Sequence, residues 1–209
     1  DSELREVVDE LYVDDAVDIV EEMPANVVRR ILSQADPQMR KDINEILRYP
    51  ENSAGSIMTT EYVSLRPDMS VGESILRIRR QGVDKETIYT CYVTQGRTLL
   101  GIVTVKDLLL AEDDDQLIQD IMITNIISVS TMADQEEAAQ MLSKYNFLAL
   151  PVVDGENRMV GIVTFDDAMD VMEDEFTEDI EIMGGMTPSE KTYLKSSVFD
   201  LFKHRIPWL

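Results

Sequence analysis

Fifteen residues from Asp166 to Ile180, DDAMDVMEDEFTEDI, carry eight carboxylates and no positive charge. Apolar residues return every three or four positions, which predicts one amphipathic helix. Like charges four apart on a helix repel by about 0.2–0.5 kcal/mol per pair, so its four such pairs together cost about 1–2 kcal/mol. Carboxylates offer only oxygen ligands, which hard cations prefer. The stretch therefore predicts a cation-binding helix or, more simply, a solvated helix face.

Mg²⁺ is the cation that this pattern favours. The ordered Asp, Gly and Glu positions of a calcium-binding EF-hand loop are absent. Mg²⁺ keeps several of its waters and takes one or two carboxylates, so scattered carboxylate pairs at domain interfaces suit it. The strongest candidates are Asp167, Asp170 and Glu173. The further candidates are Asp174, Glu178 and Asp179 on the same helix and the i,i+4 pair Asp14 and Asp18 near the N-terminus.

Composition excludes several other functions. The 209 residues fit one or two domains, and 41 acids against 19 bases give a net charge of −22, which argues against a nucleic-acid partner. One Cys and one His do not make an internal disulfide, a His/Cys zinc site or a His-based catalytic triad. No run of about 18 apolar residues is present to cross a membrane. We therefore expect that this chain is not an enzyme.

Residues 1–54 lack the alternation of strands and form three helical phrases that end at Pro24, Pro37 and Pro50. Because proline cannot continue a helix, this spacing predicts a bundle of short helices. ENSAG (51–55) follows as a turn-forming linker. The change of composition after this linker, together with the repeat described next, divides the chain into a partial helical domain at 1–54, two repeats at 55–118 and 119–183, and a last segment at 184–209 that contains a further predicted helix.

The two repeats show the same order of predicted elements. IMTTEYVSL (57–65) matches IMITNIISV (121–129), and LLGIVTVKDLL (99–109) matches MVGIVTFDDAM (159–169). Each copy has the pattern of a short strand, a helix, two strands joined by a turn, and a second helix. The predicted fold class is mixed α+β and α/β: an all-α N-terminal domain, then two β-α-β-β-α repeats and a C-terminal helix.

The repeated unit, which ends in GIVT, two further residues and Asp, resembles the CBS domain. The phrases YPENSAGSIMTTEYVSL, ALPVVD and DVMEDEFTEDIEIMGG resemble the cytosolic region of MgtE-type magnesium transporters, and this resemblance covers essentially the whole chain. It implies a helical N-terminal domain, a tandem CBS pair, and a connecting helix that leads to the first transmembrane helix. It also implies a homodimer through the CBS domains, at the cytoplasmic face of the cell membrane and joined to its own pore domain.

The end of the sequence agrees with this implication. KHRIPWL places basic residues before Trp208, as is typical of the cytoplasmic side of a membrane span, so we expect the first span to begin there. TPSE (187–190) predicts a capping box at the start of the connecting helix. In the family that the chain resembles, this helix shares metal sites with the CBS pair, which adds Asp200, the one acid of the helix after Glu190, to the candidate Mg²⁺ ligands.

These features predict a regulatory magnesium sensor. Mg²⁺ held by carboxylates of different domains would draw the domains together, and repulsion would separate them when Mg²⁺ falls. The resemblance implies the direction of gating, in which bound Mg²⁺ holds the connecting helices in the closed-gate position and low Mg²⁺ releases them.

An adenine nucleotide is the alternative ligand, and ATP could also act as an added modulator. CBS pairs often hold adenine nucleotides in the cleft between their repeats. The T-x-x-D segments pair Thr104 with Asp107 and Thr164 with Asp167, and each Asp could bind ribose hydroxyls. No glycine-rich phosphate loop is present, and the charge of −22 opposes a polyphosphate unless Mg²⁺ accompanies it.

Overall fold

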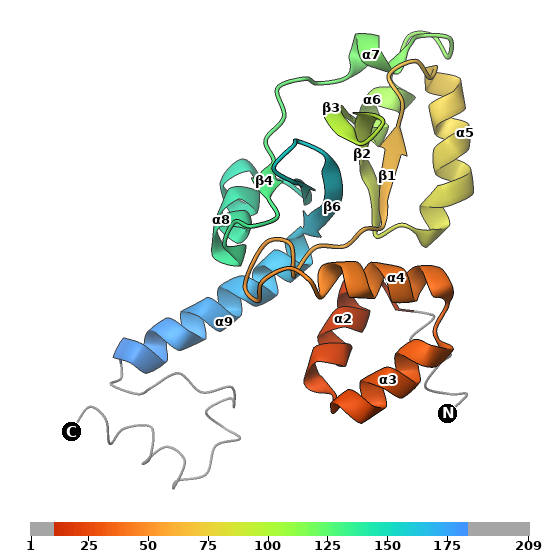
Figure 1. Cartoon of the computed structure of the whole chain (residues 1–209). Helices are drawn as coiled ribbons and strands as arrows, with labels where there is room; N and C mark the ends of the chain where they lie inside the picture. Colours follow the sequence, from red (N-terminus) through yellow and green to blue (C-terminus); the bar gives the residue numbers. More distant parts are fainter. Residues whose placement is uncertain (1–10, 184–209) are drawn as a thin grey trace, which may run out of the picture.

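The N-terminal part of the computed structural model, which describes residues 11–183, is a bundle of short helices (Figure 1). These helices are α2 (Val13–Glu22), α3 (Ala25–Gln34) and α4 (Pro37–Ile46). Pro24 immediately precedes α3, and Pro37 is the first residue of α4. The carboxylate of Asp36 caps α4 by accepting a hydrogen bond from the backbone N–H of Gln38 at 2.8 Å. The prolines separate the helices as the sequence predicts.

Two repeats with the same order of elements follow. The first consists of β1 (Tyr62–Leu65), α5 (Val71–Gln81), the 3₁₀ turn η1 (Gly82–Asp84), β2 (Thr87–Gln95), β3 (Thr98–Thr104) and α6 (Val105–Leu109). After α7 (Ile118–Ile121), the second consists of β4 (Val129–Ser130), α8 (Gln135–Tyr145), β5 (Ala149–Val153), β6 (Met159–Thr164) and α9 (Phe165–Met183). In each sheet the first strand runs parallel to the second, and the second runs antiparallel to the third. This confirms the predicted fold class for the helical domain and the two repeats, while the predicted C-terminal helix lies outside the described residues.

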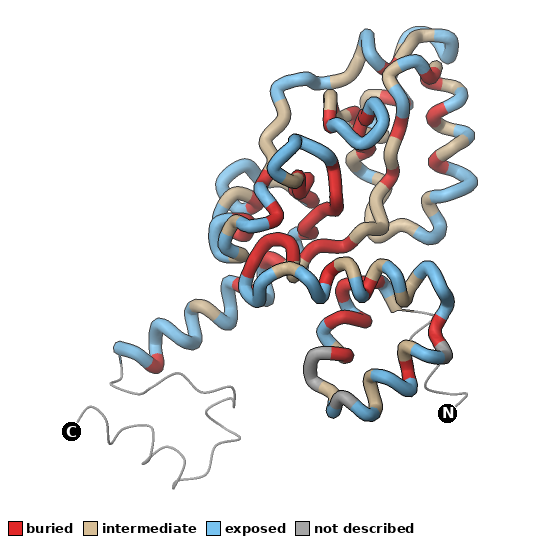
Figure 2. Tube along the Cα trace, viewed as in Figure 1, coloured by how far each residue is buried: buried red, intermediate tan, exposed pale blue. Residues whose placement is uncertain are grey.

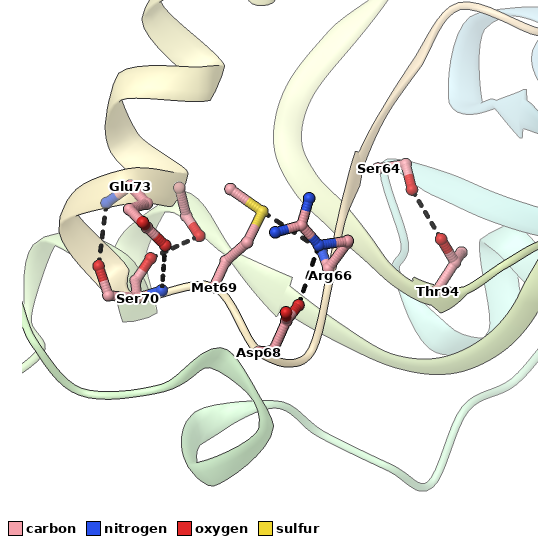
Figure 3. Close-up of polar contacts among 8 residues, drawn as sticks. Ser64, Arg66, Asp68, Met69, Ser70, Glu73 and Thr94 are labelled. Carbon is pink, nitrogen blue, oxygen red and sulfur yellow. Dashed lines mark hydrogen bonds and ion pairs between the residues drawn. The ribbon is translucent and has the colours of Figure 1, made fainter.

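Side-chain hydrogen bonds fix the start of α5 and tie β1 to its neighbour (Figure 3). Ser70 and Glu73 form a capping box: the hydroxyl of Ser70 accepts from the N–H of Glu73 at 3.2 Å, and the carboxylate of Glu73 accepts from the N–H of Ser70 at 3.0 Å. The hydroxyls of Ser64 on β1 and Thr94 on β2 are hydrogen-bonded at 2.8 Å. The short strand β1 therefore has a fixed place in the first sheet.

The repeats exchange their leading segments. Thr59, which precedes the first repeat's sheet, forms two backbone hydrogen bonds with Ile162 of β6 in the second repeat, at 2.8 and 2.9 Å. Reciprocally, Ile123 forms two with Ile102 of β3 in the first repeat, at 2.8 and 3.0 Å. Each IM-x-T segment (IMTT at 57–60 and IMIT at 121–124) therefore extends the sheet of the other copy. This exchange joins the two repeats into one body.

The glycine of each GIVT phrase leaves room for this exchange. A Cβ at Gly101 would lie 2.7 Å from the sulfur of Met122, and a Cβ at Gly161 would lie 2.6 Å from the sulfur of Met58. Both distances are far below an ordinary van der Waals contact between carbon and sulfur. The glycine of each copy therefore contacts the methionine in the leading segment of the other copy.

The helical domain shares a core with the second repeat. One apolar cluster contains Val13 and Val17 of α2 together with Ala168 and Val171 of α9. Figure 2 shows buried positions on α2 and at the start of α9, while the far half of α9 is mostly exposed. This shared core sets α2 beside the beginning of α9. None of the helices within residues 11–183 combines the length and hydropathy that a bilayer crossing needs.

Candidate metal-binding site

A cavity of about 460 Å³ lies between α2, the linker after α4, and α9. Among the described residues, no Lys, Arg or His lines it. Its acidic lining residues are Asp14 and Asp18 from α2, Glu51 from the linker, and Asp167, Asp170 and Asp174 from α9. The remaining lining residues include the polar side chains of Asn52, Ser56 and Gln135. The cavity thus collects oxygen ligands from both domains without a positive charge to balance them.

Burial makes two of these carboxylates hard to ionise. Asp14 is only 9% exposed, and burial, followed by the negative charge of Asp167, raises the pKa of Asp14 to about 8. Burial also raises the pKa of Asp167 to about 6, although the hydroxyl of Thr164 donates a hydrogen bond to its carboxylate and opposes the shift. A carboxylate with a raised pKa gains free energy when a cation binds beside it. The cavity therefore has the electrostatic character of a cation site.

Most of the α2 and α9 candidates come together here. Asp14, Asp18, Asp167, Asp170 and Asp174 all line the cavity. The candidates outside its lining are the exposed α9 residues Glu173, Glu178 and Asp179. Asp200 lies outside the described residues, as does the connecting helix predicted at 184–209. Glu51 lines the cavity but was missed by the sequence reasoning, because its only signal is a place in a turn-forming linker.

The acids are not arranged as a closed metal cage. Within residues 11–183, no three His, Cys, Asp or Glu side chains stand close enough together to hold an ion without moving. This spacing suits Mg²⁺, because Mg²⁺ binds through one or two carboxylates and fills its other positions with water. A cavity of this size leaves room for such a hydrated ion.

Two further acids next to α2 were not found from the sequence. Glu86 has a carboxylate oxygen that is buried and has no hydrogen-bond partner in the described part of the chain. Burial, then the charges of Asp166 and Asp167, raise the pKa of Glu86 to about 7. Glu61 accepts a hydrogen bond from the backbone N–H of Val13 at 3.1 Å. Both acids flank strands of the first repeat, where no helical spacing signals their position.

A second cavity, of about 200 Å³, lies between the two repeats. It is mostly apolar and is lined by Thr90, Tyr92 and Ile102 of the first repeat and by Asn125, Ile127, Asn146, Phe147, Leu148, Ala149 and Pro151. Tyr92 is fully buried, and its hydroxyl has no hydrogen-bond partner among residues 11–183. The cavity therefore offers apolar walls and an unused polar group, as sites for flat organic ligands do.

The predicted ribose-binding residues lie elsewhere. Thr104 and Asp107 form the capping box of α6, in which each accepts a hydrogen bond from the other's backbone N–H, at 3.0 and 3.1 Å. Thr164 donates to Asp167 at the start of α9. None of the four lines the second cavity. The T-x-x-D segments thus act in this structure as helix starts.

Comparison with known proteins gives the family. Residues 1–52 match the MgtE intracellular N domain, and residues 54–114 and 118–174 each match the CBS domain. The structure superposes on the cytosolic domain of the Mg²⁺ channel MgtE, solved in complex with ATP, with a TM-score of 0.77 and 41% identity over 80% of this chain and 69% of that one. This chain belongs to the MgtE family.

Two other similar proteins agree with this assignment. The soluble part of a magnesium transporter superposes with a TM-score of 0.79 and 38% identity, over 82% of this chain and 67% of that one. The magnesium transporter MgtE of Thermus thermophilus is 40% identical over 197 residues, which are 93% of this chain and 43% of that protein. The chain therefore spans less than half the length of this full transporter relative.

Proposed function

We propose that this chain is the cytosolic regulatory region of a magnesium transporter and that it senses Mg²⁺ at the acid-lined cavity. The observation that carries this proposal is the cavity itself, where six carboxylates from two domains meet without a basic lining residue in the described chain. The solved relatives are described as parts of a Mg²⁺ channel and of a magnesium transporter. The proposed role involves no catalysis and no nucleic acid.

Carboxylates on the two sides of the cavity would act as opposing surfaces. Asp14 and Asp18 on α2 face Asp167, Asp170 and Asp174 on α9, and their mutual repulsion disfavours the docked arrangement. Bound Mg²⁺ would supply the positive charge that offsets this repulsion. Because α9 leads into the segment at 184–209, docking of α2 would hold the connecting helices in the closed-gate position, and separation would release them. In this proposal the helical domain ends at residue 54, the first CBS domain at 118 and the second at 183, where the connecting segment begins.

Small-angle scattering with and without millimolar Mg²⁺ tests the sensor. The double variant Asp170→Asn with Asp174→Asn removes two cavity carboxylates, whereas Glu178→Gln with Asp179→Asn removes two exposed charges from the same helix. We expect Mg²⁺ to compact the wild type and the second variant, and to have a much weaker effect on the first. An equal Mg²⁺ response in both variants would rule out the cavity as the sensing site.

An adenine nucleotide is the second candidate ligand, and the cavity between the repeats favours it. The lining of this cavity is mostly apolar and includes Tyr92, whose buried hydroxyl has no hydrogen-bond partner among residues 11–183, and one solved relative was determined in complex with ATP. Calorimetry with ATP and AMP tests this role. Replacing Ala149 by Trp would fill the cavity and should abolish nucleotide binding while leaving the Mg²⁺ response in place.

We also propose that the chain forms a homodimer through its CBS pair. One face of α9 exposes a stripe of large apolar residues at helical spacing: Phe165, Met169, Met172, Phe176 and Ile180. Such spacing suits a seam between two helices. Sedimentation velocity should show a dimer for the wild type and a monomer for Phe176→Asp. In the cell, the dimer would lie at the cytoplasmic face of the membrane, joined to its own pore domain.

A further inference from the structure

Glu61 lies where three parts of the molecule meet. Two residues before it, Thr59 pairs with Ile162 of the second repeat. Its own carbonyl oxygen accepts a hydrogen bond from the N–H of Glu86 in the first repeat at 3.0 Å. Its carboxylate reaches into the helical domain and accepts from the N–H of Val13 at 3.1 Å. Glu61 is therefore fixed to the CBS pair by its backbone and to the helical domain by its side chain.

The first residue of α2 has its hydrogen-bond acceptor in this contact. The residue before the helix, Tyr12, makes no side-chain capping hydrogen bond. The first N–H groups of a helix have no partner within the helix and carry partial positive charge, so a carboxylate is a strong acceptor for them. Glu61 supplies that carboxylate to Val13, the first residue of α2, from another domain.

The contact also sets the place of the sensing carboxylates. Asp14 directly follows Val13, and Asp18 lies one turn further along α2. Both line the acid-lined cavity, whereas Glu61 does not. Fixing the first turn of α2 against the CBS pair therefore fixes where these two carboxylates stand relative to α9. A cap from within the helical domain would not have this effect, because it would move with the domain.

We propose that Glu61 is a positioning residue that caps α2 across the domain boundary and thereby sets the Mg²⁺ concentration at which the helical domain docks. This inference rests on the proposed function, since it concerns how easily the cavity assembles. The proposal predicts the direction in which loss of Glu61 changes the Mg²⁺ midpoint, the Mg²⁺ concentration at which half of the molecules are docked. If Glu61 acted only as one more repelling acid, its removal would ease docking and lower the Mg²⁺ midpoint. As a cap, its removal raises the midpoint.

Three variants separate these possibilities. Glu61→Ala removes the acceptor, Glu61→Gln keeps an acceptor oxygen at the same reach, and Glu112→Gln removes an exposed charge from the segment after α6 as the matched control. We expect Glu61→Ala to raise the Mg²⁺ midpoint of compaction by about fivefold, the change typical of losing one helix-capping hydrogen bond. Glu61→Gln should restore most of the wild-type midpoint, and Glu112→Gln should leave it unchanged.

Amide hydrogen exchange at Val13 gives an independent measurement. Exchange at Val13 should be faster in Glu61→Ala than in the wild type, with or without Mg²⁺, while amides of β5 and β6 stay protected. An unchanged or lowered midpoint in Glu61→Ala, or unchanged exchange at Val13, would overturn the inference. If the wild type itself fails to compact with Mg²⁺, the proposed sensing function is wrong. Exchange at Val13 alone then tests whether Glu61 caps α2.

Discussion

Asp14 in the first turn of α2 and Asp167 in the first turn of α9 line one cavity, and the charge of Asp167 adds to burial in raising the pKa of Asp14 to about 8. The two residues belong to different domains, so this electrostatic coupling exists only while the domains are docked. It gives the docked arrangement a dependence on protons as well as on cations.

The first prediction concerns pH in the absence of divalent cations. The pKa of Asp14 is about 8 in the docked state and near its ordinary value of about 4 when the residue is solvated. A raised folded-state pKa stabilises docking fully below the ordinary value, and this contribution is lost as pH rises towards 8. In EDTA, scattering should therefore show the wild type expanding between about pH 5 and pH 8.

The matched variants for this pH titration are Asp14→Asn and Asp179→Asn. Asp14→Asn keeps the size of the side chain but cannot ionise, so the expansion should become smaller. The part that remains comes from Asp167 and Glu86, whose pKa values are also raised, to about 6 and about 7. Asp179 is exposed on α9, and its replacement should leave the curve of the wild type unchanged. Identical curves for all three proteins would contradict the assignment of Asp14 as the main titrating group.

The second prediction concerns protons released by Mg²⁺. At about pH 6, protonation still favours the docked arrangement without Mg²⁺, and Asp14 is then protonated, yet a carboxylate that binds Mg²⁺ must be ionised. Mg²⁺ binding should therefore release protons at about pH 6 and release few above about pH 9. Calorimetry in buffers with different ionisation enthalpies measures the number of protons released, and a binding enthalpy independent of the buffer at about pH 6 would refute the prediction.

The sequence predicts the acidic side of the cavity well because helical spacing is periodic. Asp167, Asp170 and Asp174 share one helical face, and this face lines the cavity. Which of the apolar faces of the helix would be buried could not be predicted. Of the apolar residues that mark α9 in the sequence, Ala168 is buried while Met169 and Phe176 are exposed, because only one of two apolar faces meets the core.

Residues without periodic neighbours escaped prediction. Glu51, Glu61 and Glu86 lie in a linker or beside strands, where their roles depend on segments distant in the sequence. The exchange of the IM-x-T segments was also not predicted, although both of its partners, Met and Gly, stood in the repeated phrases. A repeat shows which residues recur, whereas their contacts across copies follow only from the packing of the two sheets.

The third prediction tests this exchange. Gly161→Ala would place a Cβ 2.6 Å from the sulfur of Met58 and 2.7 Å from the carbonyl oxygen of Thr59. Since the carbonyl belongs to the exchanged segment, relief would require that segment to move. We expect the free energy of unfolding to fall by about 1–3 kcal/mol, as for other overpacked cores. Gly155→Ala, where a Cβ meets nothing within 4 Å, should change the denaturation midpoint little.

The fourth prediction replaces the cation by a side chain. Asp170→Lys places an ammonium group in the cavity among the carboxylates of Asp14, Asp18 and Asp174, so that the repulsion across it is offset without Mg²⁺. This variant should resist proteolysis and remain compact in EDTA, and added Mg²⁺ should change it little. Glu178→Lys makes the same change of charge at an exposed position of α9 outside the cavity lining, and should still require Mg²⁺ for compaction. Constitutive compaction of both variants would show that net charge, rather than charge within the cavity, governs docking.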